Sequence, residues 1–172
     1  MDAVLAELLG DLPPAQFVEL YLHRVPLSRP ERAGPYARLA TWERVEAILA
    51  RPGVDFMVAK DGRLWEGGTS PGFAKVRELH ADGYTLVIRH AEEHDPGIGA
   101  LAEGFRRDLA APVNVHVYCT PANRRGFGWH YDAEDVFILL ACGARRFICA
   151  RTRSSPGRSR RRCRATRTSS AR

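Results

Sequence analysis

Apolar residues recur at helical spacing through the first half of the chain, whereas alternating apolar and polar positions accumulate toward the second half. In the first stretch, for example, Val4, Leu5, Leu8 and Leu9 fall on one helical face, and Asp11 to Pro14 break the pattern. Thr41 is a suitable N-cap for a later helix. The pattern predicts helices over 2–9, 15–23, 42–50, 73–80 and 97–110.

Strand-like segments separate and follow these helices. Asp61 and Gly62 form a hairpin signal between an alternating run and a short strand through Trp65. Strands are predicted over 54–60, 84–90, 113–119, 135–141 and 145–149. Because helices dominate the start and strands the end, we expect an α+β chain: a helical lead-in followed by an antiparallel barrel.

The last 22 residues differ abruptly from the rest. Residues 151–172 hold nine of the 26 basic residues and no acid, and they contain no Val, Ile, Leu, Met or aromatic residue. The preceding 150 residues are mildly acidic, so the net charge of +6 describes the tail alone. We therefore divide the chain into a helical region (1–53), a partial barrel (54–150) and a tail expected to be disordered (151–172).

Three interpretations of the tail compete. An Arg- and Ser-rich arm can bind nucleic acid through the phosphates, with strong dependence on salt. A solvated tail without function is the second. The third is a reading-frame shift in a GC-rich gene, with residues 148–172 as its product, and we favour it because the change falls inside a barrel that has not yet closed.

The sequence also indicates the cellular compartment and the chemical state of the cysteines. No apolar run is long enough to span a membrane, and the first residues include acids and lack the basic start of a secretory signal. The cytoplasm is therefore the expected compartment. The four cysteines, Cys119, Cys142, Cys149 and Cys163, form no C-x-x-C pair, so thiols are expected rather than disulfides or a zinc site.

His130 and Asp132 are the leading candidates for chemistry. Two residues apart on an extended strand, their side chains point to the same face. An imidazole beside a carboxylate supplies two of the three ligands of a 2-His-1-carboxylate iron site. The alternative is a hydrogen-bonded structural pair. No histidine follows His130 in this sequence, so the expected third ligand is missing.

The run NVHVYCTPANRRGFGWHYDAEDVFILLACGARRF (114–147) resembles the JmjC-type cupin oxygenases, in particular the branch that hydroxylates ribosomal proteins. Weaker similarity extends to FVELYLHRVPL (17–27) and LHADGYTLVIRH (79–90). The resemblance implies a double-stranded β-helix, or jelly-roll, barrel that is incomplete at its C-terminal end.

The resemblance also implies roles for individual residues. His130 and Asp132 match iron ligands, and Arg145 matches the basic residue that holds the distal carboxylate of 2-oxoglutarate. Tyr118 matches a strand tyrosine that reaches the same co-substrate, and His116 stands where relatives often carry Asn. The plainer alternatives are a solvated turn for Arg145 and an ordinary core position for Tyr118.

Two functional hypotheses and one structural one follow. The first is a protein hydroxylase dependent on Fe(II) and 2-oxoglutarate, with a ribosomal protein as the expected kind of substrate, weak or inactive because one ligand is missing. The second is a non-catalytic cupin-like module that binds RNA or the ribosome through the basic tail. The third is a destabilised fragment whose unpaired edges, 135–141 and 145–149, lead to homodimers or aggregates.

Overall fold

The computed structural model describes residues 3–67, 71–124, 132–151 and 161–166. In this structure the helices begin and end close to the positions that the apolar spacing predicts. The α-helices are α1 (Val4–Leu9), α2 (Pro14–Leu20), α3 (Trp42–Leu49), α4 (Phe73–Ala81) and α5 (Pro96–Leu109). Two short 3₁₀ helices, η1 (Gly34–Leu39) and η2 (Ala91–Glu93), fall in segments where no helix was predicted. The five predicted helices are thus confirmed.

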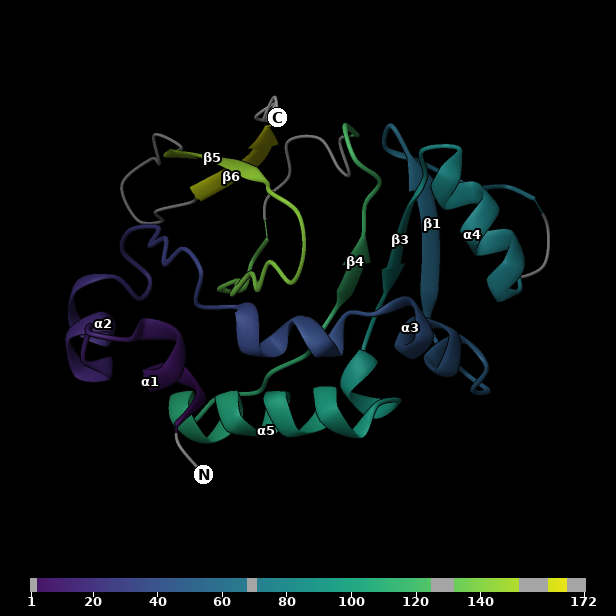
Figure 1. Ribbon diagram of the computed structural model, residues 1–172. Coiled ribbons are helices and arrows are strands. Elements are labelled where there is room, and N and C mark those ends of the chain that lie inside the picture. The colour runs from purple at the N-terminus through teal and green to yellow at the C-terminus, as the bar shows by residue number, and fades with distance from the viewer. Residues whose placement is uncertain (1–2, 68–70, 125–131, 152–160, 167–172) are drawn as a thin grey trace. The chain divides into compact units, whose positions relative to one another are not determined.

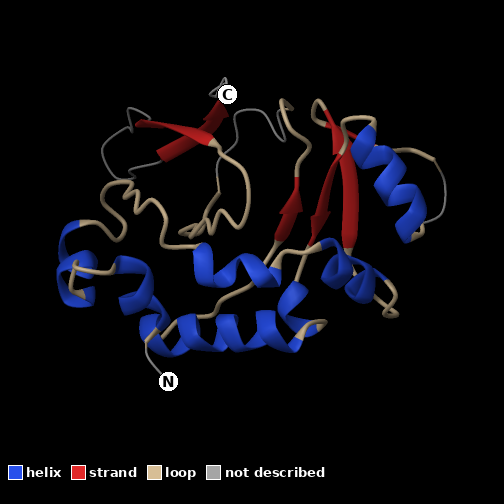
Figure 2. Cartoon of the chain, in the orientation of Figure 1, coloured by secondary structure: helices blue, strands red, loops and turns tan. Residues whose placement is uncertain are grey.

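Among the described residues, six strands form two sheets, and Figure 2 shows these strands in red. They are β1 (Phe56–Lys60), β2 (Arg63–Leu64), β3 (Thr85–Ile88), β4 (Val117–Cys119), β5 (Arg146–Arg151) and β6 (Arg161–Thr166). One sheet has the order β2-β1-β3-β4, and the other pairs β5 with β6. The mixture of helices and antiparallel strands confirms the α+β class and is consistent with part of a jelly roll.

The chain divides into two units, and the boundaries between them in the sequence fall inside β1, β3 and β4. The first comprises Met1–Phe56 with Val87–Val117, and the second comprises Met57–Leu86 with Tyr118–Arg172. In the first, α1 contacts both α2 and α5 (Figure 1). Its core is apolar and almost fully enclosed, as shown by Leu5, Val45, Ile48, Ile98 and Phe105.

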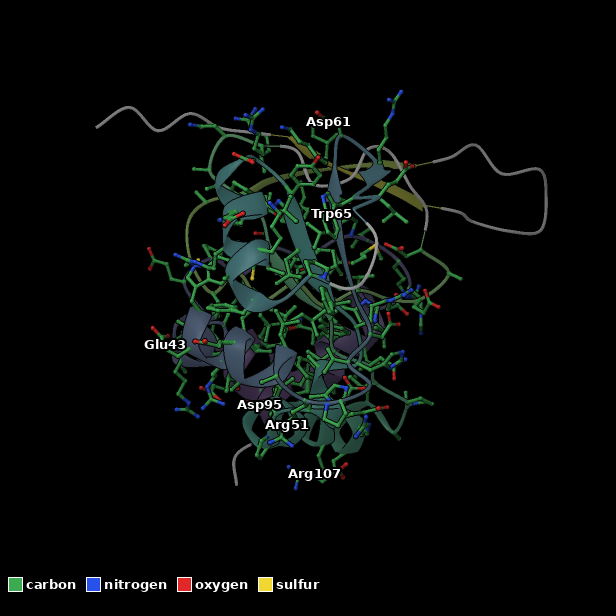
Figure 3. All side chains as sticks on the ribbon, turned by 90° about the vertical axis from the view of Figure 1, so that its right-hand side faces the viewer. Glu43, Arg51, Asp61, Trp65, Asp95 and Arg107 are labelled. Atoms are coloured by element: carbon green, nitrogen blue, oxygen red, sulfur yellow. The ribbon has the colours of Figure 1, made fainter. Side chains whose placement is uncertain are left out.

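An ion pair joins two helices of the first unit. Asp95 is the N-cap of α5 and accepts a hydrogen bond from the Ile98 amide over 2.9 Å. Its other carboxylate oxygen accepts from the Arg44 guanidinium of α3 over 2.5 Å. Figure 3 shows Asp95 between these two helices. One carboxylate therefore caps α5 and fastens it to α3.

The second unit contains a tight hairpin and a smaller core. Asp61 and Gly62 both have positive φ, 52° and 79°, which confirms the turn predicted between β1 and β2. Val58, Val76 and Leu86 are buried in this unit, and Thr85 is a polar residue buried with them. Helix α4 contributes two of the buried apolar side chains of this unit, Val76 and Leu79.

The strand predicted over 135–141 is wrong: residues 132–145 contain no strand. Its apolar side chains are exposed instead, among them Val136 and Ile138, at 59% and 53%. A strand needs a partner for its backbone N–H and C=O groups, and none pairs with this segment among the described residues. The continuous apolar run typical of a strand is present, but no described backbone segment pairs with it.

The tail also differs from expectation. Residues 161–166 form β6 and pair with β5 in antiparallel register, although no regular structure was expected over 151–172. Main-chain hydrogen bonds of a ladder need no apolar side chain, which is why composition did not signal this strand. The division of the chain at residues 53 and 150 stays a prediction.

No helix within the described residues is both long and apolar enough to cross a membrane.

Candidate active site

Tyr118, Thr120 and Arg145 lie together in the second unit. Tyr118 is on β4, Thr120 follows this strand directly, and Arg145 immediately precedes β5. The Arg145 guanidinium donates a hydrogen bond to the Thr120 hydroxyl over 3.1 Å. The structure thus brings two of the predicted co-substrate residues, Tyr118 and Arg145, to one place and adds a third.

Thr120 links this group to the core. Its hydroxyl is 3.3 Å from the hydroxyl of Thr85, a residue of β3 that is only 1% exposed. A hydroxyl offers two acceptor positions and one donor, so Thr120 can hold both partners at once. The buried threonine thereby fixes Thr120, and Thr120 in turn orients the guanidinium.

The guanidinium of Arg145 is half-buried. Burial lowers the pKa of Arg145 from its usual value, and the negative charge of an ionised Tyr118 opposes that change. The guanidinium also lies over the Phe147 ring, with its central carbon 5.9 Å from the ring centroid. Arg146, by contrast, is exposed, as strand alternation predicted for two neighbouring residues with different roles.

Arg145 has no acidic partner among the described residues. Across the part of the chain that the structure describes, no Asp or Glu forms an ion pair with it. Removing a cation from water without a counter-ion is costly, and a carboxylate is the natural compensating group for a guanidinium. The arrangement is therefore suited to binding an anion, and the planar fork of arginine favours a carboxylate held by two parallel bonds.

The predicted iron ligands are described only in part. His130 lies outside the described residues. Asp132 is described, and it is exposed. An exposed carboxylate has the chemistry of a metal ligand, but the structure leaves the pairing of His130 and Asp132 a prediction.

His116 lies in the first unit. Its ring lies edge-on to that of His90, with 5.8 Å between the ring centroids. The residue is at the surface, yet partial burial of its ring lowers the pKa of His116, and the charge of His90 adds to this effect. Its predicted role toward 2-oxoglutarate remains a prediction.

Cys119 lies on β4 between Tyr118 and Thr120. Burial raises the pKa of the Cys119 thiol to about 11, with the nearby Cys142 thiol as a further cause. A thiol with such a pKa stays protonated at neutral pH and is a poor nucleophile and a poor metal ligand. Both Cys119 and Cys142 are free, as expected from their spacing.

Sequence reasoning missed Thr120. It is part of the run CTP that carries the family resemblance, and it stands two positions after Tyr118, on the same side of an extended chain. That alternation was a usable signal. The contact with Arg145, 25 positions later in the sequence, was not visible in the pattern.

Comparisons with known proteins find similarity to JmjC-domain proteins. A family model described as the JmjC domain matches residues 100–170, a range that includes the Tyr118, Thr120 and Arg145 group and most of the tail. Proteins named bifunctional lysine-specific demethylase and histidyl-hydroxylase NO66 match at low identity. The one from Drosophila erecta is 23% identical over 120 residues, which cover 65% of this chain and 18% of that protein.

Two further NO66 proteins give similar values. The protein from Drosophila willistoni is 23% identical over 155 residues, 84% of this chain and 20% of the relative. The protein from Branchiostoma floridae is 25% identical over 105 residues, 56% of this chain and 17% of the relative. The chain therefore spans only about a fifth of the length of these curated relatives.

Proposed function

Because this chain is of the JmjC oxygenase type, we propose that its ancestral activity is hydroxylation of a protein side chain, dependent on Fe(II) and 2-oxoglutarate. The observation that carries this proposal is the half-buried Arg145 guanidinium, which has no acidic partner among the described residues and is held by Thr120. Such a group fits a dicarboxylate co-substrate better than it fits a neutral ligand.

Each protein group has a defined task in this proposal. Arg145 binds the distal carboxylate of 2-oxoglutarate, Thr120 keeps the guanidinium in place, and the Tyr118 hydroxyl reaches the same co-substrate. His130 and Asp132 are the residues that would hold the iron. When bound, Fe(II) couples the oxidative decarboxylation of 2-oxoglutarate to hydroxylation of a nearby C–H bond, and the protein supplies binding and orientation.

The activity of this polypeptide is expected to be weak. The sequence offers His130 and Asp132 but no later histidine, so two protein ligands remain where the family chemistry uses three. Fewer ligands mean weaker binding of Fe(II). The relatives are named for demethylation of lysine and hydroxylation of histidine, and by that analogy we propose a protein substrate. The resemblance of residues 114–147 to the ribosomal-protein hydroxylases favours a ribosomal protein, and the cytoplasm remains the expected compartment.

The direct test measures succinate produced from 2-oxoglutarate by the full chain at several Fe(II) concentrations. We expect slow formation that rises with Fe(II) and is abolished in Asp132→Ala. Rapid, saturating turnover at low Fe(II) would contradict the weak-site proposal. Formation of succinate that is the same in Asp132→Ala and in the parent chain would contradict the assignment of the ligand.

A second candidate function rests on the tail. The nine arginines of 151–172 and the absence of acids there suit contacts with phosphates. In this alternative the chain is a non-catalytic cupin-like module that binds RNA or the ribosome. Binding of a labelled RNA that weakens steeply with salt and is lost on removal of 151–172 supports it, and salt-independent binding argues against it.

A further inference from the structure

A second group of metal-binding side chains lies in the first unit, at the turn that follows β3. His90, Glu92 and Glu93 each present a ligand atom there, and these atoms all lie within 4.8 Å of one another. The backbone at His90 is left-handed, with φ 51° and ψ 40°, and this turn leads the chain directly into η2. Three donors therefore come from four consecutive residues.

His116 brings a fourth donor from a distant part of the sequence. Its ring centroid is 5.8 Å from that of His90, and the two rings meet edge to face. Two hydrogen bonds fasten the two segments: the Ala91 amide donates to the Val115 carbonyl over 2.9 Å, and the Val115 amide donates to the side-chain Oε2 of Glu92 over 2.8 Å. The imidazoles are thus held near each other by the main chain.

One carboxylate oxygen of Glu92 accepts a hydrogen bond, and the other lies near the His90 imidazole. The Glu92 side chain is only 5% exposed, and Oε2 accepts from the Val115 amide. Oε1 lies 3.8 Å from Nδ1 of His90 and 3.8 Å from the Arg106 guanidinium, which is too far for a hydrogen bond to either. A metal ion bound to both the His90 imidazole and Oε1 of Glu92 would draw these two groups closer together than 3.8 Å.

Arg106 is the competing positive charge, and it has other partners. Its guanidinium donates to the Val113 carbonyl over 2.7 Å and lies 3.8 Å from the Glu103 carboxylate. The guanidinium lies as close to the Glu103 carboxylate as to Oε1 of Glu92, so it keeps the Val113 carbonyl and Glu103 as partners when Oε1 binds a metal ion. Glu93, on the exposed side, contributes a second carboxylate that offsets the added positive charge.

We propose that His90, His116 and Glu92, with Glu93 on the solvent side, form a binding site for a divalent transition-metal ion such as Zn²⁺. Two imidazole nitrogens and a carboxylate oxygen are a typical ligand set for Zn²⁺, and an exposed edge leaves room for water as a further ligand. The site shares no residue with the His130 and Asp132 pair. Its role is structural, because the ion would join η2 to the segment that enters β4.

The test uses Co²⁺ as a spectroscopic probe in place of Zn²⁺. Co²⁺ is titrated into the full chain carrying His130→Ala and Asp132→Ala, so that the proposed iron ligands do not contribute. We expect visible absorption typical of Co²⁺ in a low-coordinate site with nitrogen and oxygen ligands, saturating at one ion per chain and displaced by Zn²⁺. Absence of such absorption, or binding without saturation, would overturn the proposal.

Matched variants show which residues bind the ion. His90→Ala and His116→Ala in that background are expected to weaken binding of Co²⁺ by about tenfold or more. Glu92→Gln keeps an acceptor for the Val115 amide and removes the charge, so it should fold normally and still bind the ion less tightly. His80→Ala, which changes a histidine of α4, is the control. Equal affinity in His90→Ala, with an unchanged circular dichroism spectrum, would overturn the site.

Zn²⁺ should also stabilise the folded chain through preferential binding. The midpoint of thermal unfolding is expected to rise on addition of Zn²⁺ in the His130→Ala and Asp132→Ala background. The same rise should be lost in His90→Ala. An equal shift with and without His90 would count against a site at this turn.

Discussion

The Arg145 guanidinium and the Thr120 hydroxyl are joined by a 3.1 Å hydrogen bond, although 25 positions separate the two residues in the sequence. Thr120 is itself 3.3 Å from the buried Thr85 hydroxyl. The positive charge of Arg145 is therefore connected to the interior of the second unit through two hydroxyls. This connection gives the proposed co-substrate site a fixed orientation before any ligand binds.

Thr120→Val tests the orienting hydroxyl. The variant keeps the branched shape but removes the acceptor, so the guanidinium loses a neutral partner whose contribution is about 1 kcal/mol. We expect the affinity for 2-oxoglutarate to fall about fivefold. Thr120→Ser keeps the hydroxyl and should bind as the parent chain does. Isothermal titration calorimetry measures both, and equal affinity in Thr120→Val would mean that Arg145 needs no orienting partner.

Asp95 provides a prediction on stability. Replacing it with Asn removes the charge that faces Arg44, while the side chain can still cap α5. The free energy of unfolding at neutral pH should fall by about 1 kcal/mol, whereas Asp95→Ala, which also removes the cap, should cost about 2 kcal/mol. Urea unfolding followed by circular dichroism measures these differences. A neutral effect of Asp95→Ala would contradict the capping role.

The same carboxylate predicts a dependence on pH. Burial favours the protonated form, but the Ile98 amide and the Arg44 guanidinium outweigh it and hold the pKa of Asp95 below its usual value. A carboxyl group whose pKa is lower in the folded state stabilises the fold above its unfolded pKa of about 4 and loses this contribution as the pH falls through the folded pKa. The difference between Asp95→Asn and the parent chain should therefore shrink below about pH 4.

The exposed apolar segment predicts self-association. Val136, Ile138 and Leu140 are 59%, 53% and 41% exposed, and they belong to a continuous apolar run that has no pairing partner among the described residues. We expect homodimers or larger species at micromolar concentration. The double variant Val136→Lys and Ile138→Lys should shift the chain toward monomer, whereas Val18→Lys, at another exposed apolar position, should not. Light scattering after size-exclusion chromatography measures the mass, and a monomeric parent chain would contradict this prediction.

The sequence predicted the helices well, because each buries a stripe whose spacing is visible in a single segment. Val45 and Ile48, for example, stand three positions apart in the helix predicted over 42–50 and are almost fully buried. The α+β class followed from the order of helical and alternating patterns. Thr41 was likewise recognised as a cap, and its hydroxyl accepts from the Arg44 amide over 3.4 Å.

Failures arose where structure depends on a distant partner. The apolar run over 135–141 predicted a strand, but a strand forms only when another backbone pairs with it, and local sequence carries no such information. The same limit explains Thr120, whose partners Thr85 and Arg145 lie 35 and 25 positions away. The group of His90 and His116 likewise depends on two segments brought together by the fold.

The binding of 2-oxoglutarate to Arg145 tests the proposed function most directly. The co-substrate is titrated calorimetrically into the full chain, with Mn²⁺ in place of Fe(II) to prevent turnover. Arg145→Ala should weaken binding by about tenfold or more, because a hydrogen-bonded charge contributes about 1.5–3 kcal/mol, while the neighbouring Arg146→Ala should bind as the parent chain does. If Arg145→Ala binds 2-oxoglutarate as tightly as the parent chain, Arg145 is not the carboxylate-binding residue and the proposed function loses its main support.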